Sequence, residues 1–193
     1  MFSVDNREKL LLMGVARRSL ITAVENGGPA ETLVVSSTLE CAGAFVTLRR
    51  RGRLRGCIGQ IVANQRAVEI ISYAARAAAL EDPRFDPVRA EELPEIEIEL
   101  SLLSRAQEIE PHQIEVGKHG LIVTRGWQRG LLLPQVATEH RWEKLRFLEE
   151  TCVKAGLERH AWKDSQTRLQ AFTALVFSES EIVRDAELET PAS

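Results

Sequence analysis

The sequence predicts an α+β fold with a mainly antiparallel sheet, and three observations support this class. From Glu95 to Leu102 apolar and polar residues alternate strictly, which predicts a strand with one buried side and one solvent-facing side. Two stretches have the composition of β-hairpins, and each is followed by a helix and then a strand. The regular helix–strand alternation of a doubly wound parallel sheet is absent, which favours α+β over α/β.

The chain is predicted to begin with a helix over about residues 6–26. Asp5 precedes this helix as a candidate N-cap, and Glu8 follows three residues later, as in a capping box. The segment Gly27-Gly28-Pro29 is predicted to end it. The helix carries an apolar stripe at helical spacing, made of Leu10, Met13, Leu20, Ile21 and Val24.

A hairpin and a second helix follow. Residues 43–48 and 54–61 are rich in strand-forming residues, and the intervening segment Arg50 to Gly52 is predicted to be the turn. The second helix spans about residues 65–80 and has little polar surface, which predicts that it is largely buried. It is expected to stop before Pro83, because the residue before a proline disfavours the α conformation.

The second half of the chain is predicted to repeat this order. Residues 104–120 are mixed and polar and are expected to form a loop with a short helix. Residues 121–124 and 130–133 have the composition of a second hairpin. A third helix is predicted from about residue 139 to 155, and a last strand from 171 to 177.

Composition excludes several classes of function. The chain has 193 residues, with 25 Lys and Arg against 28 Asp and Glu, so its net charge of −3 gives no global attraction to nucleic acid or to anionic membranes. The three cysteines are widely spaced and odd in number, which indicates a reducing, cytoplasmic location rather than a disulfide framework. No signal peptide and no apolar run of membrane-spanning length are visible.

Residues 55–59, with the sequence Arg-Gly-Cys-Ile-Gly, are the strongest candidate for chemistry. In an extended chain Arg53, Arg55 and Cys57 lie on one face, where the guanidinium groups would stabilise a thiolate. The glycines on both sides of the cysteine would let a ligand or another backbone approach closely. These features predict either a catalytic Cys57 with Arg55 holding an anionic substrate, or an anion site.

The same letters also have a structural interpretation, which is favoured for Cys57 taken by itself. Cysteine often only fills space in a core, and glycine in a strand often marks only a bulge. The five arginines between residues 49 and 55 could hold phosphate, but no aromatic residue for base stacking lies among them. Nucleic-acid binding is therefore disfavoured.

Metal and hydrolase motifs are missing from the sequence. The four histidines are scattered, and neither Cys-x2-Cys nor His-Glu-x-x-His nor Gly-x-Ser-x-Gly is present. We therefore predict no metal and no cofactor, although ligands from distant segments stay possible.

Two proline segments add polar side chains, since Asp82 and Arg84 could pair across a turn or line a cleft. Gln135, in apolar company, must find hydrogen-bond partners.

The chain resembles the AMMECR1 domain family, whose bacterial and archaeal members are called AmmeMemoRadiSam system protein A. The resemblance runs from the first helix to about Phe177. It is carried in order by these segments: Gly43-Ala44-Phe45-Val46-Thr47-Leu48, Leu54-Arg55-Gly56-Cys57-Ile58-Gly59, Asp82-Pro83-Arg84-Phe85, Leu93-Pro94, Leu133-Pro134-Gln135-Val136 and Lys154-Ala155-Gly156-Leu157 before Trp162.

The resemblance implies helices around a curved, mainly antiparallel sheet, often described as two subdomains. We accordingly expect one AMMECR1-like domain over residues 1–178, with a subdomain break near 104–120, and an acidic flexible tail over 179–193. The family carries no established reaction, and its name implies an association with a Memo-like protein and a radical SAM protein. The resemblance points to a candidate site made of Arg55, Gly56, Cys57 and Gly59 and, more weakly, of Arg84 and Gln135.

Three functional hypotheses follow from the sequence. The favoured one is a non-catalytic partner or accessory component of the Memo-like and radical SAM proteins. The second is a cysteine-dependent enzyme that uses Cys57, with Arg55 as the anion holder. The third is RNA or nucleotide binding through the arginine hairpin. The oligomeric state, the substrate and the partner surface are not predicted by the sequence.

Overall fold

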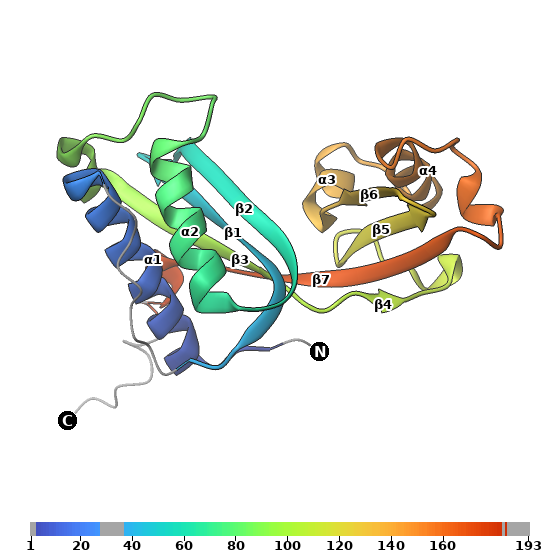
Figure 1. The fold of residues 1–193 in the computed structure, drawn as a ribbon, viewed down its shortest axis with the longest axis horizontal. Coiled ribbons are helices and arrows are strands. Elements are labelled where there is room, and N and C mark those ends of the chain that lie inside the picture. The colour runs from blue at the N-terminus through green and yellow to red at the C-terminus, as the bar shows by residue number, and fades with distance from the viewer. Residues whose placement is uncertain (1–2, 28–36, 183, 185–193) are drawn as a thin grey trace. The chain divides into compact units, whose positions relative to one another are not determined.

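The computed structural model describes residues 3–27, 37–182 and 184, and it confirms the α+β class (Figure 1). The chain divides into two compact units. The first comprises residues 1–103 and 175–193, and the second comprises residues 104–174. The first helix ends as predicted at Gly27, whose φ of +63° forms its C-cap, whereas Gly28 and Pro29 lie outside the described residues, as does most of the predicted tail.

The first unit is a curled antiparallel sheet with two helices on one face (Figure 1). Its strands are β1 (Glu40–Arg50), β2 (Arg53–Arg66) and β3 (Ile96–Leu103), in the order β2-β1-β3. The helices are α1 (Asn6–Asn26) and α2 (Ala67–Leu80). Because β2 stands at the end of this order, its outer backbone groups must find partners other than a strand.

Local sequence explains how α1 and the β1–β2 hairpin form. Asp5 caps α1 as predicted, since its Oδ1 accepts a hydrogen bond from the Glu8 amide at 2.7 Å. The hairpin turns through Arg51 and Gly52, whose φ angles are +51° and +75°. Two successive positive φ angles are typical of a type I′ turn, which suits the twist of paired strands.

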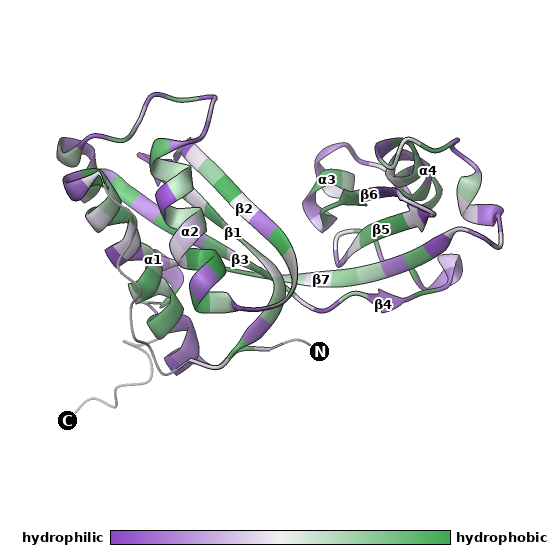
Figure 2. Ribbon diagram, viewed as in Figure 1, coloured by the Kyte–Doolittle hydropathy of each residue, from purple (hydrophilic) through white to green (hydrophobic). Residues whose placement is uncertain are grey.

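The core of the first unit lies between the sheet and the helices. Ala44, Val46 and Leu48 of β1 are fully buried, whereas the alternate residues Phe45 and Thr47 lie on the other face and are half-buried. The predicted alternation in β3 is confirmed by its burial pattern. Figure 2 shows the hydrophobic residues along α2 and the strands that it covers. Residues 55, 57 and 59 of β2 therefore lie on the face that these helices leave uncovered.

The second unit has its own antiparallel strands and core. Its strands are β4 (Gln107–Glu108), β5 (His119–Arg125), β6 (Gln128–Leu132) and β7 (Arg168–Ser178), in the order β4-β7-β5-β6. Its largest fully buried side chain is Phe147. The strand β7 continues past this unit into the first one. The short 3-10 helices of the chain are η1 (Ala90–Glu95), η2 (Pro111–Gln113) and η3 (Ala161–Lys163).

The prediction of one helix from residue 139 to 155 was wrong at its start, because the helix in this stretch, α4 (Lys144–Lys154), begins five residues later. A separate short helix, α3 (Pro134–Glu139), precedes it. The interruption lies at Arg141, whose φ of +52° is left-handed, and the next amide, that of Trp142, donates back to the Ala137 carbonyl at 2.8 Å. This is the usual geometry of a helix C-terminus, and because glycine normally forms it, an arginine at this position does not predict a helix end.

Glu179, which is predicted to belong to the tail, lies in a helical turn. Its carboxylate accepts hydrogen bonds from Arg17 and from the Ile98 amide.

Within the described ranges, the helices fall short of the length and apolar character needed to cross a bilayer.

Candidate functional site

The backbone of Cys57 at the edge of the first unit is held by two side chains instead of by another strand. Its N–H donates to Oδ2 of Asp82 at 2.8 Å, and its carbonyl accepts from Nη2 of Arg84 at 3.3 Å. A carboxylate and a guanidinium thus replace the acceptor and the donor of a neighbouring strand. Satisfying edge groups in this way blocks pairing with other chains and orders the segment around the cysteine.

The turn after α2 places both side chains. The Phe85 amide donates to the Asp82 carbonyl at 3.1 Å, which closes a β-turn with Pro83 at its second position. Within this turn the Arg84 guanidinium forks onto the Asp82 carboxylate, with Nε–Oδ1 at 2.9 Å and Nη2–Oδ2 at 2.7 Å. The Arg84 amide also donates to Oδ1 at 3.1 Å. The pairing of Asp82 with Arg84 across the turn, which the sequence suggested, is confirmed.

This pair has an asymmetric exposure that matters for its chemistry. The Asp82 side chain is 2% exposed, whereas that of Arg84 is 54% exposed. The Arg84 hydrogen bonds, more than any other cause, hold the pKa of Asp82 well below its usual range, and the amides of Cys57 and Arg84 lower it further. Asp82 therefore stays ionised and is a weak base, while the guanidinium presents a fixed positive charge to solvent.

The groups around Cys57 are poorly suited to take a proton from its thiol. Thr47, its cross-strand partner, donates from Oγ1 to Sγ at 3.4 Å. The pKa of Arg84 is raised, chiefly by its hydrogen bond with Asp82 and to a smaller extent by the Cys57 side chain. A hydroxyl, a guanidinium and a low-pKa carboxylate can orient a thiol or attract an anion, but they are poor general bases.

The three cysteines differ in accessibility. Cys57 is half-buried, whereas Cys41 and Cys152 are buried, and all three are free thiols. Burial raises the pKa of both Cys41 and Cys152. Reactivity toward a thiol reagent is therefore expected at Cys57 first.

Arg55 is engaged within the protein. Its Nε and Nη2 each lie 2.9 Å from one oxygen of the Glu92 carboxylate, which makes a two-pronged ion pair. Its remaining donors reach the carbonyls of Asp86 at 2.9 Å and Pro87 at 3.3 Å. The guanidinium thus ties residues 86–92 to β2, and an anionic substrate would have to displace Glu92 to bind there.

Glu92 has the electrostatics of a structural ion pair. Its side chain is 11% exposed, and it accepts from Arg50 at 3.0 Å and from the Arg89 amide at 2.9 Å in addition to Arg55. Its hydrogen bonds with Arg55, followed by the Arg89 amide and the charges of Arg55 and Arg50, lower the pKa from 4.5 to about 2. Glu92 is ionised at neutral pH, and its single negative charge is shared between Arg55 and Arg50.

The two glycines of the segment allow close approach by parts of the same chain. A Cβ at Gly56 would lie 2.1 Å from the carbonyl oxygen of Ala78 in α2, so this helix packs directly on the strand backbone. A Cβ at Gly59 would lie 2.3 Å from the ring of Phe45. The close approach expected at these positions is therefore made by a helix backbone and an aromatic ring.

Three other arginines of the β1–β2 hairpin, Arg49, Arg50 and Arg51, are paired with glutamates, whereas Arg53 is exposed. Arg50 contacts both Glu92 and Glu95, with Nε–Oε2 of Glu95 at 2.6 Å, and Arg51 also contacts Glu95. Arg49 lies 3.8 Å from Glu99 on the neighbouring β3. These carboxylates offset the positive charge that phosphate binding would need, so the hairpin is a poor phosphate site.

Gln135 lies in the second unit, whereas the other five predicted site residues belong to the first. It follows Pro134 at the start of α3, and its backbone carbonyl accepts from Thr138 at 2.8 Å. Its Oε1 is buried, and within the described residues it lacks a hydrogen-bond partner. The expectation that this amide finds a partner is thus not met for its oxygen.

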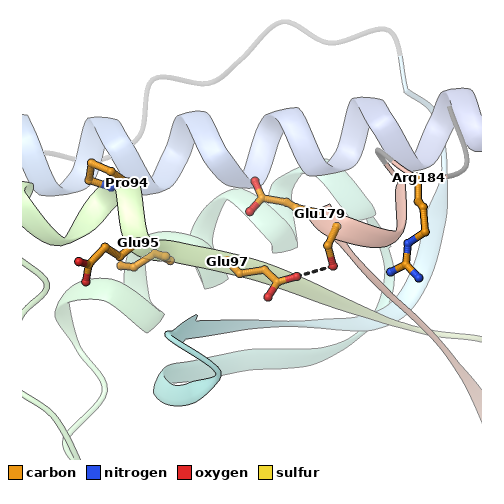
Figure 3. A pocket seen from close by; sticks show the side chains of 7 residues that line it. Pro94, Glu95, Glu97, Glu179 and Arg184 are labelled. Carbon is orange, nitrogen blue, oxygen red and sulfur yellow. Dashed lines mark hydrogen bonds between the residues drawn. The ribbon is translucent and has the colours of Figure 1, made fainter. Parts of the chain in front are cut away.

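A separate hollow of about 500 Å³ lies at the start of β3, and its charged groups are largely paired (Figure 3). Glu97 accepts from Ser180 at 2.6 Å, Glu95 contacts Arg50 and Arg51, and Glu179 contacts Arg17. In the described ranges, no set of three or more His, Cys, Asp or Glu side chains is gathered as in a metal site. These contacts favour a structural role for the hollow's glutamates.

Sequence reasoning did not identify Thr47, Glu92 or the role of Asp82 as an edge partner. Glu92 is 37 residues from Arg55, and Asp82 is 25 residues from Cys57, so neither contact has a local signal. The one available hint was the Asp-Pro-Arg order, which is typical of a turn whose first side chain bonds to its own backbone.

Comparison with known proteins decides the family. The AMMECR1 family model matches residues 13–177, which include every residue of this site. The chain belongs to the AMMECR1 family. A relative from Thermococcus gammatolerans is 41% identical over 194 residues, covering 93% of this chain and 94% of that protein. Another from Methanothermobacter thermautotrophicus is 47% identical over 144 residues, covering 71% of this chain and 75% of the relative.

A solved structure of the same fold is also similar to this AMMECR1 protein. The crystal structure of an uncharacterized protein from Pyrococcus horikoshii superimposes with a TM-score of 0.72 at 39% identity, covering 89% of this chain and 91% of that one. The names of these AMMECR1-family relatives state no activity. The biochemical function must therefore be argued from the site.

Proposed function

We propose that this AMMECR1 protein is an accessory component that acts with Memo-like and radical SAM proteins, and that it meets a partner through Arg84 beside Cys57. The observation that carries the proposal is that the Arg84 guanidinium is fixed in place and exposed at the same time. It is fixed by Asp82 and the Cys57 carbonyl, yet the side chain remains 54% exposed. A charged group held in place before binding loses little side-chain entropy when a partner carboxylate or phosphate meets it.

The surroundings of the thiol support an accessory role over independent catalysis. The Thr47 hydroxyl and the Asp82 carboxylate are weak bases, and the Arg84 guanidinium is already protonated, so none of them activates a nucleophile as a histidine would. The free thiols agree with a reducing, cytoplasmic compartment, where such partners would work.

A second candidate is cysteine-dependent chemistry at Cys57, and the contact of the Arg84 guanidinium with the Cys57 carbonyl favours it. In this version Arg84, rather than the less exposed Arg55, would hold an anionic substrate. Cys57 would act as the nucleophile or the acceptor group. Nucleotide binding through the hairpin is the weakest of the three hypotheses because four of its five arginines already contact glutamates.

Co-expression of the AMMECR1 protein with a Memo-like and a radical SAM protein tests the favoured proposal. The three proteins, or two of them, are expected to co-purify and to associate at micromolar concentration. The proposal fails if purified proteins do not associate at that concentration and the activity of each partner is unchanged by the AMMECR1 protein.

A further inference from the structure

The turn between β5 and β6 displays Trp127 on the surface of the second unit. Its side chain is 92% exposed, whereas the next most exposed large apolar residue in the described part of the chain, Leu145, is 55% exposed. Tryptophan is highly buried on average because its ring carries a large apolar area. The exposed indole contributes almost nothing to the core, so folding does not account for it.

The support beneath this indole is rigid. Arg125 and Gln128 are paired across the turn, and Gly126 at the first central position has φ of +60°, as in a tight type II′ turn. The Gln128 side chain donates to the Gly156 carbonyl at 2.7 Å, which joins the base of the turn to the segment that follows α4. A large side chain on such a support loses little freedom when it is buried by a partner.

Positive charge flanks the indole. Arg125 lies 3.4 Å from Asp164, while Arg129 is exposed and, among the described residues, has no ion-pair partner. The second unit carries eleven Lys and Arg against nine Asp and Glu, although the whole chain has 25 against 28. A partner surface at this turn is therefore expected to carry carboxylates.

We propose that Trp127 and Arg129 form a docking site for a protein whose surface has an apolar pocket rimmed by carboxylates. Tryptophan and arginine dominate the energetics of protein interfaces. The immediate neighbours Gly126 and Gln128 add no apolar area for entering a membrane, and a single aromatic residue offers no succession of stacked bases. The inference rests on the proposed accessory function, because it assigns a second surface to the same partners.

Titration calorimetry with the Memo-like protein and the radical SAM protein in turn tests this docking site. Trp127→Ala is expected to weaken binding of one of them by about tenfold or more, and Trp127→Phe by less. Leu145→Ala, which also removes an exposed apolar side chain from the second unit, is expected to change affinity by less than about twofold. The melting temperatures of all three variants are expected to be close to that of the wild type.

Charge reversal tests the carboxylate rim. Arg129→Glu is expected to weaken binding by about tenfold and to reduce its dependence on salt. Arg7→Glu makes the same change in net charge on an exposed residue at the start of α1, where a carboxylate is favoured, and is expected to leave affinity unchanged. Equal affinity of Arg129→Glu and the wild type would overturn the proposal that carboxylates of the partner contact Arg129.

The two failures are distinguishable. If the wild type binds a partner and Trp127→Ala binds it equally well, the docking site is overturned while the accessory function stands. If the wild type binds neither protein, the accessory function and the docking site that rests on it are both overturned.

Discussion

The amide of Cys57 donates to the carboxylate of Asp82 at 2.8 Å, and this bond joins the edge strand β2 to the turn that follows α2. The same carboxylate binds the guanidinium of Arg84, which in turn binds the Cys57 carbonyl. One buried aspartate therefore orders the cysteine segment and positions an exposed arginine beside it. Edge protection and site construction depend on the same contacts.

Replacing Asp82 tests this dependence. Asp82→Asn keeps the size of the side chain but removes the charge that binds Arg84 and the Cys57 amide, so we expect a loss of about 2–3 kcal/mol in the free energy of unfolding. Urea denaturation measures it. Asp86→Asn removes the same charge from an exposed side chain nearby and is expected to cost less than about 0.5 kcal/mol. Equal stability of the two variants would contradict a central role for Asp82.

Two glycine substitutions separate close packing from backbone propensity. Gly56→Ala would place a Cβ 2.1 Å from the Ala78 carbonyl oxygen, so α2 must shift and stability should fall by about 2 kcal/mol or more. Gly14→Ala, in α1, meets nothing within 4 Å and is expected to raise stability by about 0.5–1 kcal/mol. Thermal melting of both variants checks the opposite signs, and a neutral Gly56→Ala would show that β2 and α2 are not in tight contact.

Acid is expected to weaken the fold through Glu92. Its pKa is about 2 in the folded protein against an ordinary value of 4.5, so the ion pair contributes fully above 4.5. Between these values the unfolded chain binds more protons than the folded one, and stability falls as the pH drops. Denaturation midpoints between about pH 5 and about pH 2.5 measure this loss. The stability advantage of the wild type over Glu92→Gln should shrink across that range, and a constant advantage would contradict the assignment.

Thiol accessibility gives a prediction at the candidate site. Iodoacetamide should modify Cys57 in the native protein faster than Cys41 or Cys152, because both of these are buried and have raised pKa values. Peptide mass spectrometry over a time course measures the three rates. If Cys57 reacts as slowly as Cys152, the second candidate function, cysteine-dependent chemistry, is excluded.

Features with a local physical cause could be predicted from the sequence. The bounds of α1 and its Asp5 cap follow from a cap residue and an apolar period, and β3 follows from strict alternation. The division of α3 from α4 could not be predicted. It depends on Arg141 adopting a left-handed φ of +52° that sequence rules reserve for glycine.

The site shows the same limit. Composition points to Cys57 and to close packing at the glycines, and turn chemistry points to the pairing of Asp82 with Arg84, whereas Arg84 is a predicted site residue only through the family resemblance. The ion pair of Arg55 was not predicted, since its partner Glu92 comes from a 3-10 helix 37 residues away. Both arginines are paired, and the fold decides which of them stays exposed: the Arg55 side chain is 16% exposed and that of Arg84 is 54% exposed.

The central claim is that the fixed, exposed guanidinium of Arg84 is a contact for the partner. The most direct measurement is titration calorimetry of the Memo-like and radical SAM proteins with the Arg84→Gln variant. The control is Arg53→Gln, which removes an exposed cation from β2, the strand that carries Cys57. The account predicts that Arg84→Gln weakens binding by about tenfold while Arg53→Gln changes it by less than about twofold. Equal affinities for the wild type and Arg84→Gln, in a variant that is still folded, would contradict it.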